Sequence, residues 1–123
     1  MTSKTTDLSL DEIFNLAKSA LINNGANEEN ADAVASTVTN AERDGSVSHG
    51  LFRIPGYIKA LQSNKVDGSA VPEIEEITPV ILRCDAQNGF APLAHKYGIE
   101  KLINAANTFG IAGLSIQRCH HFA

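Results

Sequence analysis

Ten residues in the middle of the chain, 48–57, hold more groups that could do chemistry than any other stretch. Ser48 precedes His49, Arg53 follows four residues after the histidine, and Tyr57 follows four residues after the arginine. Histidine titrates nearest to neutral pH, so it is the usual proton donor or acceptor of an active site. Arginine binds a planar carboxylate through two parallel hydrogen bonds. Judged by residue type alone, the alternative is a helix that the serine caps, with the arginine on its surface.

The backbone that must position these groups is expected to be a third helix, capped by Ser48. If its path is helical from His49 onward, then His49, Arg53 and Tyr57 share one face, which suits a substrate that bears a carboxylate. Pro55 complicates this path, because a proline inside a helix loses a hydrogen bond and clashes one turn back. The helix therefore either kinks there or restarts with Pro55 in its first turn.

Two further helices are predicted before this stretch. Ser9 and Glu12 form a capping box at the start of the first, and Gly25 ends it. Asn27 caps the second, which stops at residues 43–45. Its apolar stripe consists of small residues that allow close packing, so the two helices are expected to form an antiparallel hairpin. The stripe contains Ala31, Val34, Ala35, Val38 and Ala41.

The second half of the chain predicts a small sheet. Residues 73–77 suit a short edge strand, residues 80–85 suit a strand because they are β-branched and apolar, and residues 111–116 suit a buried strand. Between the last two, a long helix is expected with Pro92 in its first turn and Gly110 as its stop. Strand, helix and strand make a parallel crossover unit, whose active groups lie past the carboxyl ends of the strands. The helix stripe predicted to be buried contains Leu93, Ala94, Tyr97, Leu102, Ile103 and Ala106.

The run Cys119-His120-His121 follows the last of these strands and offers three groups that can bind metal. Adjacent side chains point apart, and the sequence holds no paired CxxC or HxxxH motif, so we predict no metal site. A zinc protein built on this run is the alternative. Cys84 and Cys119 are expected to be free thiols in a reducing compartment.

Composition limits the class of protein. The 123 residues are 43% hydrophobic with a net charge of −4 and no basic run, so nucleic acid and membrane are not expected partners. Without an apolar run of membrane length or a signal segment, a cytoplasmic location is expected. We predict an α+β or α/β fold with a helical domain at 1–70 and the start of a sheet-containing domain at 71–123. No GxGxxG motif follows a strand, so a Rossmann fold is not expected.

The stretch Ser-His-Gly, with arginine three residues after the glycine and then proline and tyrosine, resembles the signature of the malate/L-lactate dehydrogenase family. That resemblance implies a non-Rossmann oxidoreductase that uses NADPH or NADH. It implies that Ser48 and His49 form a proton relay, with His49 as the proton donor in reduction, and that Arg53 binds the substrate carboxylate. The cofactor would be lined by His121, Phe122 and Ala123. In some members that second histidine is the acid or base, so His121 competes with His49.

Many dehydrogenases of the family have Asn-His-Phe-Gly where this chain has residues 120–123, His-His-Phe-Ala. The latter is more similar to the branch that reduces Δ1-piperideine-2-carboxylate and Δ1-pyrroline-2-carboxylate to L-pipecolate and L-proline. The alternatives are a malate, L-lactate or ureidoglycolate dehydrogenase and, in another class, a non-catalytic helical interaction module. The resemblance also implies a homodimer for the full-length protein. We expect the chain to be an amino-terminal fragment, inactive alone, because the relay's aspartate and most of the cofactor domain would lie beyond Ala123.

Overall fold

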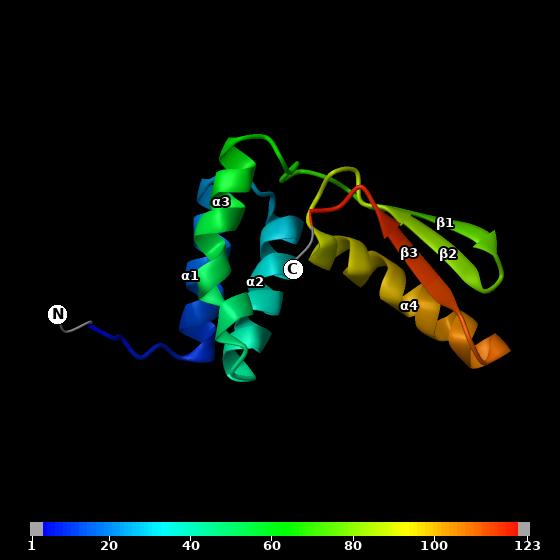
Figure 1. The fold of residues 1–123 in the computed structure, drawn as a ribbon, viewed down its shortest axis with the longest axis horizontal. Coiled ribbons are helices and arrows are strands. Elements are labelled where there is room, and N and C mark those ends of the chain that lie inside the picture. Colours follow the sequence, from blue (N-terminus) through cyan, green and yellow to red (C-terminus); the bar gives the residue numbers. More distant parts are fainter. Residues whose placement is uncertain (1–3, 121–123) are drawn as a thin grey trace.

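A computed structural model describes residues 4–120 and places a layer of helices beside a small sheet that one long helix covers (Figure 1). This mixed α+β arrangement confirms the predicted fold class. In chain order the elements are α1 (Leu10–Asn23), α2 (Glu28–Arg43), the 3-10 turns η1 (Val47–His49) and η2 (Leu51–Arg53), α3 (Ile54–Gln62), β1 (Glu73–Thr78), β2 (Ile81–Asp85), α4 (Ala91–Phe109) and β3 (Gly113–Gln117).

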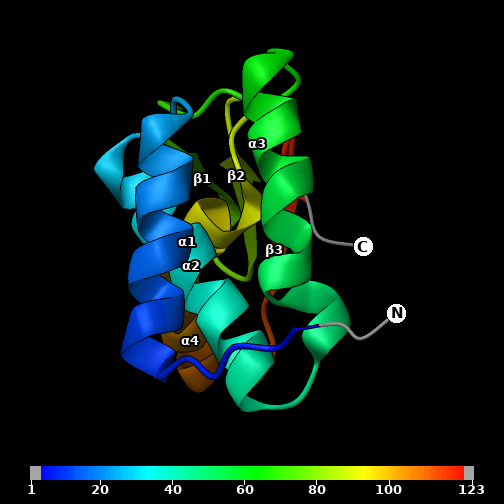
Figure 2. The ribbon, with the colours of Figure 1, turned by 90° about the vertical axis from the view of Figure 1, so that its left-hand side faces the viewer.

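Helices α1 and α2 begin where the local sequence predicts. The Ser9 hydroxyl accepts a hydrogen bond from the Glu12 amide at 3.1 Å, and the Glu12 carboxylate accepts one from the Ser9 amide at 3.1 Å. The Asn27 side chain accepts a hydrogen bond from the Asn30 amide at 3.0 Å and so caps α2. The two helices pack along their small residues as the predicted hairpin (Figure 2). Its fully buried residues include Ala17, Leu21, Ala31, Val34, Ala35 and Val38.

The sheet has β2 at its centre, with β1 antiparallel on one side and β3 parallel on the other. Helix α4 connects β2 to β3, so the predicted edge strand and the predicted parallel crossover are both confirmed. Within the described residues, the antiparallel β1 and the order β1–β2–β3 distinguish this sheet from the parallel sheet of a Rossmann fold.

Two predictions about burial in this half were wrong. Strand β3 begins at Gly113 rather than residue 111, and its residues are half-buried or exposed, while Ile111 is 77% exposed. In α4 the predicted stripe holds only at Leu93 and Ala94, whereas Tyr97 and Ile103 are exposed. The physical reason is that one helix lies on a narrow three-stranded sheet, so only their shared contact line is covered.

The buried residues form two clusters, one among the helices and one between the sheet and α4. Phe90, which precedes α4, packs into the helical cluster together with Tyr57 and Ile54 of α3. Leu61 belongs to this cluster, and Ile58 packs against it. The division into domains at 1–70 and 71–123 stays a prediction. Within residues 4–120 no helix combines the length and the apolar character that crossing a membrane requires.

Candidate active site

The chain reaches α3 through two 3-10 turns rather than through one continuous helix. Helix α3 begins at Ile54 with Pro55 in its first turn, so the restart is correct and the kink is not. The cause is Pro55, whose ring cannot follow a helical turn that starts at His49. Ser48 lies inside η1 and does not cap α3, so that part of the prediction was wrong.

These turns break the single polar face that was predicted from helical spacing. Tyr57 is buried in the helical cluster, whereas His49 and Arg53 are half-buried at the surface. The phenol therefore belongs to the core, and the imidazole and guanidinium are the groups that a substrate could reach.

Ser48 and His49 are brought together by η1. The Ser48 hydroxyl oxygen lies 2.9 Å from Nδ1 of His49, which is hydrogen-bond distance for either tautomer. The His49 amide donates to the carbonyl of Ser46 at 2.9 Å and fixes the turn beneath the ring. A proton can pass between the hydroxyl and the imidazole at this separation, as a relay requires.

Arg53 folds back over the same turns. Its Nε donates a hydrogen bond of 2.8 Å to the carbonyl of Ser48, and its backbone amide donates to Gly50 at 3.0 Å. The guanidinium is thereby held beside the Ser48–His49 pair, although three residues separate Arg53 from His49 along the chain. Its terminal nitrogens form the edge that binds carboxylates in pairs of hydrogen bonds.

Glu42 of α2 is a residue of this site that sequence reasoning missed. Its carboxylate accepts a hydrogen bond of 2.9 Å from the amide of Leu51, at the start of η2. The same side chain packs against Gly50 so closely that a β-carbon there would overlap it. With Ser48, Val47 and Phe52, it also lines a shallow open depression beside the pair. No local sequence pattern predicts this role of Glu42, because its contacts depend on how α2 packs against the turns.

Three rings connect α3 to the end of β3. The Tyr57 and Phe90 centroids are 5.8 Å apart, those of Phe90 and His120 are 5.8 Å apart, and those of Tyr57 and His120 are 6.2 Å apart. All three pairs meet edge to face, a favourable geometry for aromatic rings. Burial raises the pKa of Tyr57 to about 12, and the positive charge of Arg53 opposes that rise. The segment after β3 thus arrives one helical turn from Arg53.

The remaining predicted site residues have different outcomes. His121, Phe122 and Ala123, predicted to line the cofactor, lie outside the described residues. Cys119 is half-buried and packs against the sheet cluster, and Cys84 is fully buried within it. Between residues 4 and 120 the structure shows no group of three or more His, Cys, Asp or Glu side chains that could hold a metal ion.

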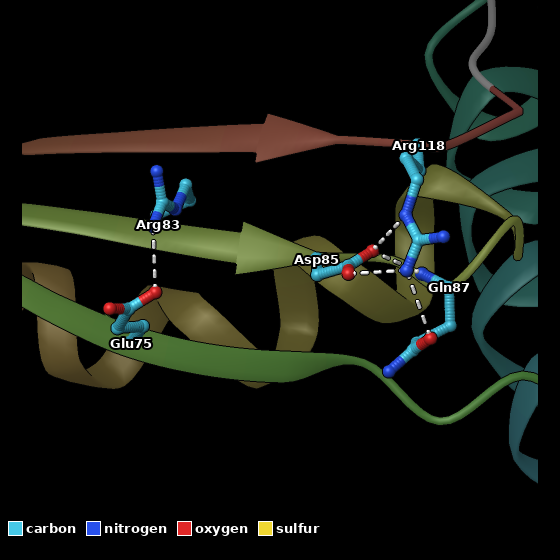
Figure 3. Close-up of polar contacts among 5 residues, drawn as sticks. All are labelled: Glu75, Arg83, Asp85, Gln87 and Arg118. Atoms are coloured by element: carbon cyan, nitrogen blue, oxygen red, sulfur yellow. Dashed lines mark hydrogen bonds and ion pairs between the residues drawn. The ribbon is translucent and has the colours of Figure 1, made fainter.

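A second missed feature lies where β2 and β3 end (Figure 3). The Arg118 guanidinium donates to both carboxylate oxygens of Asp85, from Nε at 2.9 Å and from Nη2 at 2.5 Å, and Nη2 also donates to the Gln87 side chain at 3.1 Å. This hydrogen bonding holds the pKa of Asp85 below its ordinary value and raises that of Arg118. No sequence signal pairs residues that lie 33 positions apart.

Comparison with known proteins shows what this arrangement is similar to. Residues 8–123 match the family model described as malate/L-lactate dehydrogenase. A Δ1-pyrroline-2-carboxylate reductase of Ancylobacter novellus is 45% identical over 94% of this chain and 34% of its own length. These matches confirm the family that residues 48–57 predicted, and this relative carries the name of the predicted imino-acid branch.

Solved structures of related enzymes superpose on this chain and agree with the family match. The Δ1-piperideine-2-carboxylate reductase of Pseudomonas syringae pv. tomato superposes with a TM-score of 0.92 at 42% identity, over 97% of this chain and 36% of that one. A malate dehydrogenase of Entamoeba histolytica superposes with a TM-score of 0.86 at 28% identity, over 97% of this chain and 33% of that one. The chain thus spans about a third of the length of the relatives it matches.

Proposed function

The chain belongs to the malate/L-lactate dehydrogenase family, and from that premise we propose that it carries the proton donor and the carboxylate anchor of a cyclic imino acid reductase. The substrates are Δ1-pyrroline-2-carboxylate and Δ1-piperideine-2-carboxylate, and the products are L-proline and L-pipecolate. The names of the relatives that it matches at 45% and 42% identity support this choice of substrate. The observation that carries the proposal is the 2.8 Å bond that holds Arg53 beside the Ser48–His49 pair.

Reduction of a carbon–nitrogen double bond needs a hydride at carbon and a proton at nitrogen. Amino-acid side chains supply the proton but no hydride, so the donor set of this site fits an enzyme that takes its hydride from NADPH or NADH. We propose that His121, Phe122 and Ala123 hold this cofactor, as the family resemblance implies. The nicotinamide supplies the hydride to C2 of the imine when it is bound.

The residues of this chain perform the other steps. Arg53 binds the substrate carboxylate through its terminal guanidinium nitrogens and so fixes the orientation of the ring. His49, protonated, donates a proton to the imine nitrogen, and Ser48 holds the Nδ1 edge of the imidazole through the 2.9 Å contact. The family resemblance leaves His121 as the alternative proton donor to His49.

The test compares two proteins, the chain itself and a chimera in which its residues 8–123 replace the matching third of the Pseudomonas syringae reductase. Oxidation of NADPH is followed at 340 nm with each cyclic imine and with pyruvate and oxaloacetate. We expect the chimera to reduce the imines in preference to the keto acids. We expect no turnover from the chain alone, because it spans only about a third of the length of the reductases that it matches.

Two substitutions in the chimera test the assigned roles. His49→Gln removes the proton donor and should lower kcat by roughly 10²- to 10⁴-fold. Arg53→Lys keeps the charge but loses the two-pronged bond, and should raise KM for the imine by roughly ten- to a hundredfold. His95→Gln and Arg83→Lys, at exposed positions of α4 and β2, are the matched controls and should leave both constants unchanged.

The proposal fails if His49→Gln and Arg53→Lys leave the folded chimera as active as its parent. It also fails if keto acids are reduced much faster than the imines, which would favour a 2-hydroxyacid dehydrogenase. A His121→Gln variant that loses more activity than His49→Gln would transfer the proton donor to the second histidine.

A further inference from the structure

The sheet contains two arginine–carboxylate pairs of very different construction (Figure 3). Arg83 and Glu75 lie on neighbouring strands and share a hydrogen bond of 2.8 Å from Nη2. Arg118 and Asp85 instead share two bonds, and Arg118 reaches Gln87 with a third. Two-pronged pairs fix the relative position of both side chains, which a single exposed contact does not.

The second pair lies where the backbone is under strain. Gln87, Asn88 and Arg118 all adopt left-handed backbone angles, with φ of 55°, 68° and 51°, although none of them is glycine. Residues other than glycine adopt left-handed backbone angles only where contacts with the surrounding structure offset the energetic cost. Asp85 provides such compensation, since its Oδ1 accepts both the Gln87 amide, at 2.9 Å, and Nε of Arg118. The Asn88 amide also donates to the Arg118 carbonyl at 2.8 Å.

The two turns held in this way determine where the chain goes after β3. The His120 amide donates to the Gly89 carbonyl at 2.8 Å, and the His120 carbonyl accepts from the Ala91 amide at 2.9 Å. Phe90 and His120 pair as an isolated parallel bridge, and their rings contact each other and Tyr57. The loop before α4 and the segment after β3 therefore lie together against α3, the helix that starts directly after Arg53.

From these contacts we infer that Asp85 and Arg118 are a positioning pair: they fix residues 118–120 against α3 and thereby place His120, after which the segment proposed to bind the cofactor begins. Neither side chain needs to touch a substrate for this. The placement of His120 depends only on the contacts described above, whereas the consequence for the cofactor rests on the proposed function.

Amide hydrogen exchange in the chain itself tests the placement of His120. The reporter amides are those of Asn88 and His120, with the amide of Cys84 in the centre of β2 as an internal reference. Asp85→Asn removes the charge of the acceptor. Arg118→Asn removes the guanidinium but keeps a residue that tolerates left-handed angles, so it separates the ion pair from backbone strain.

In both variants the two reporter amides should exchange about tenfold faster than in the parent, and the reference amide should exchange at the parental rate. Arg83→Gln, which removes the other arginine of Figure 3, is the matched control and should change none of them. Reporter amides that exchange at the parental rate in both folded variants would overturn the inference. If one variant does not fold, Arg118→Lys replaces it in the test, because lysine keeps the charge and loses one of the two hydrogen bonds to Asp85. Reporter amides that exchange at the parental rate in Arg118→Lys would then contradict the inference.

Kinetics in the chimera test the consequence for the cofactor. Arg118→Asn should raise KM for NADPH by about tenfold and leave KM for the imine within twofold, because Arg53 is unaffected. Arg118→Lys should recover part of the loss. An equal rise in both KM values would show a general structural defect and contradict a positioning role. A chimera without activity would refute the proposed function. The placement of His120 would then be tested by the amide exchange rates alone.

Discussion

The carboxylate of Asp85 makes the stability of the fold depend on pH. Its pKa is lowered chiefly by the hydrogen bond from Arg118 and next by the Gln87 amide. A carboxyl whose pKa is lower in the folded than in the unfolded state stabilises the fold above its unfolded pKa, near 4. That stabilisation is lost as the pH falls through the folded value. The pair at the strand ends should therefore weaken in acid and be unaffected by alkali up to the titration of arginine.

Urea unfolding of the chain between pH 7 and pH 2 measures this effect. We expect the free energy of unfolding to fall below about pH 4 and to fall less steeply in Asp85→Asn, which has no carboxyl to protonate at that position. Asp11→Asn is the control, since Asp11 is exposed in the first turn of α1 and away from any arginine pair. Identical pH profiles for Asp85→Asn and the parent would contradict the assignment of this carboxyl.

At the scale of elements, the turns η1 and η2 are held by α2 as well as by their own hydrogen bonds. Glu42 of α2 accepts the Leu51 amide and covers Gly50, so the position of the Ser48–His49 pair depends on a helix that ends before it. A β-carbon at position 50 would overlap the Glu42 side chain, so any residue other than glycine there makes that carboxylate move.

Gly50→Ala should therefore destabilise the chain by about 1–3 kcal/mol, because Glu42 must leave the Leu51 amide to make room. With Glu42→Ala already in place, the same change should cost clearly less, and this double-mutant cycle measures the coupling by urea unfolding. Gly56→Ala is the matched control. No atom lies within 4 Å of a β-carbon there, so alanine in α3 should stabilise by about 0.5–1 kcal/mol. Additive effects of the Glu42 and Gly50 changes would refute the coupling.

At the scale of the whole molecule, the helical layer and the sheet meet through a few large side chains. Tyr57 of α3, Phe90 before α4 and His120 after β3 form one edge-to-face group. Tyr97 of α4 adds a hydrogen bond of 2.6 Å to Glu29 of α2. The relative position of the Ser48–His49 pair and the carboxyl ends of the strands therefore depends strongly on the ring of Tyr57.

Tyr57→Ala should lower the free energy of unfolding by about 3–5 kcal/mol, the usual loss for a buried aromatic ring. Tyr57→Phe keeps the ring and should cost far less. The NMR resonances of the His120 ring should shift in the alanine variant and stay near their parental positions in the phenylalanine variant, since they report the contact directly. Equal stability and unchanged His120 resonances in both variants would show that the ring does not join the two parts.

The sequence by itself determined the features whose causes lie within a few residues. Ser9 with Glu12, Asn27, Pro92 and Gly110 each set a helix end through local hydrogen bonds or backbone geometry, and the structure agrees with them. The resemblance of residues 48–57 to a family signature identified the family, which the family model confirms. The contact between the side chains of Ser48 and His49 depends on the turn η1.

The tertiary structure decided everything that depends on a distant partner. Tyr57 is in the core rather than on a polar face, and Tyr97 is exposed although its spacing is that of a buried stripe. Glu42 supports Leu51, and Asp85 pairs with Arg118, without any local pattern that could pair them. Burial and such pairings depend on which surfaces meet after packing, and helical or strand periodicity fixes only the face on which a residue lies.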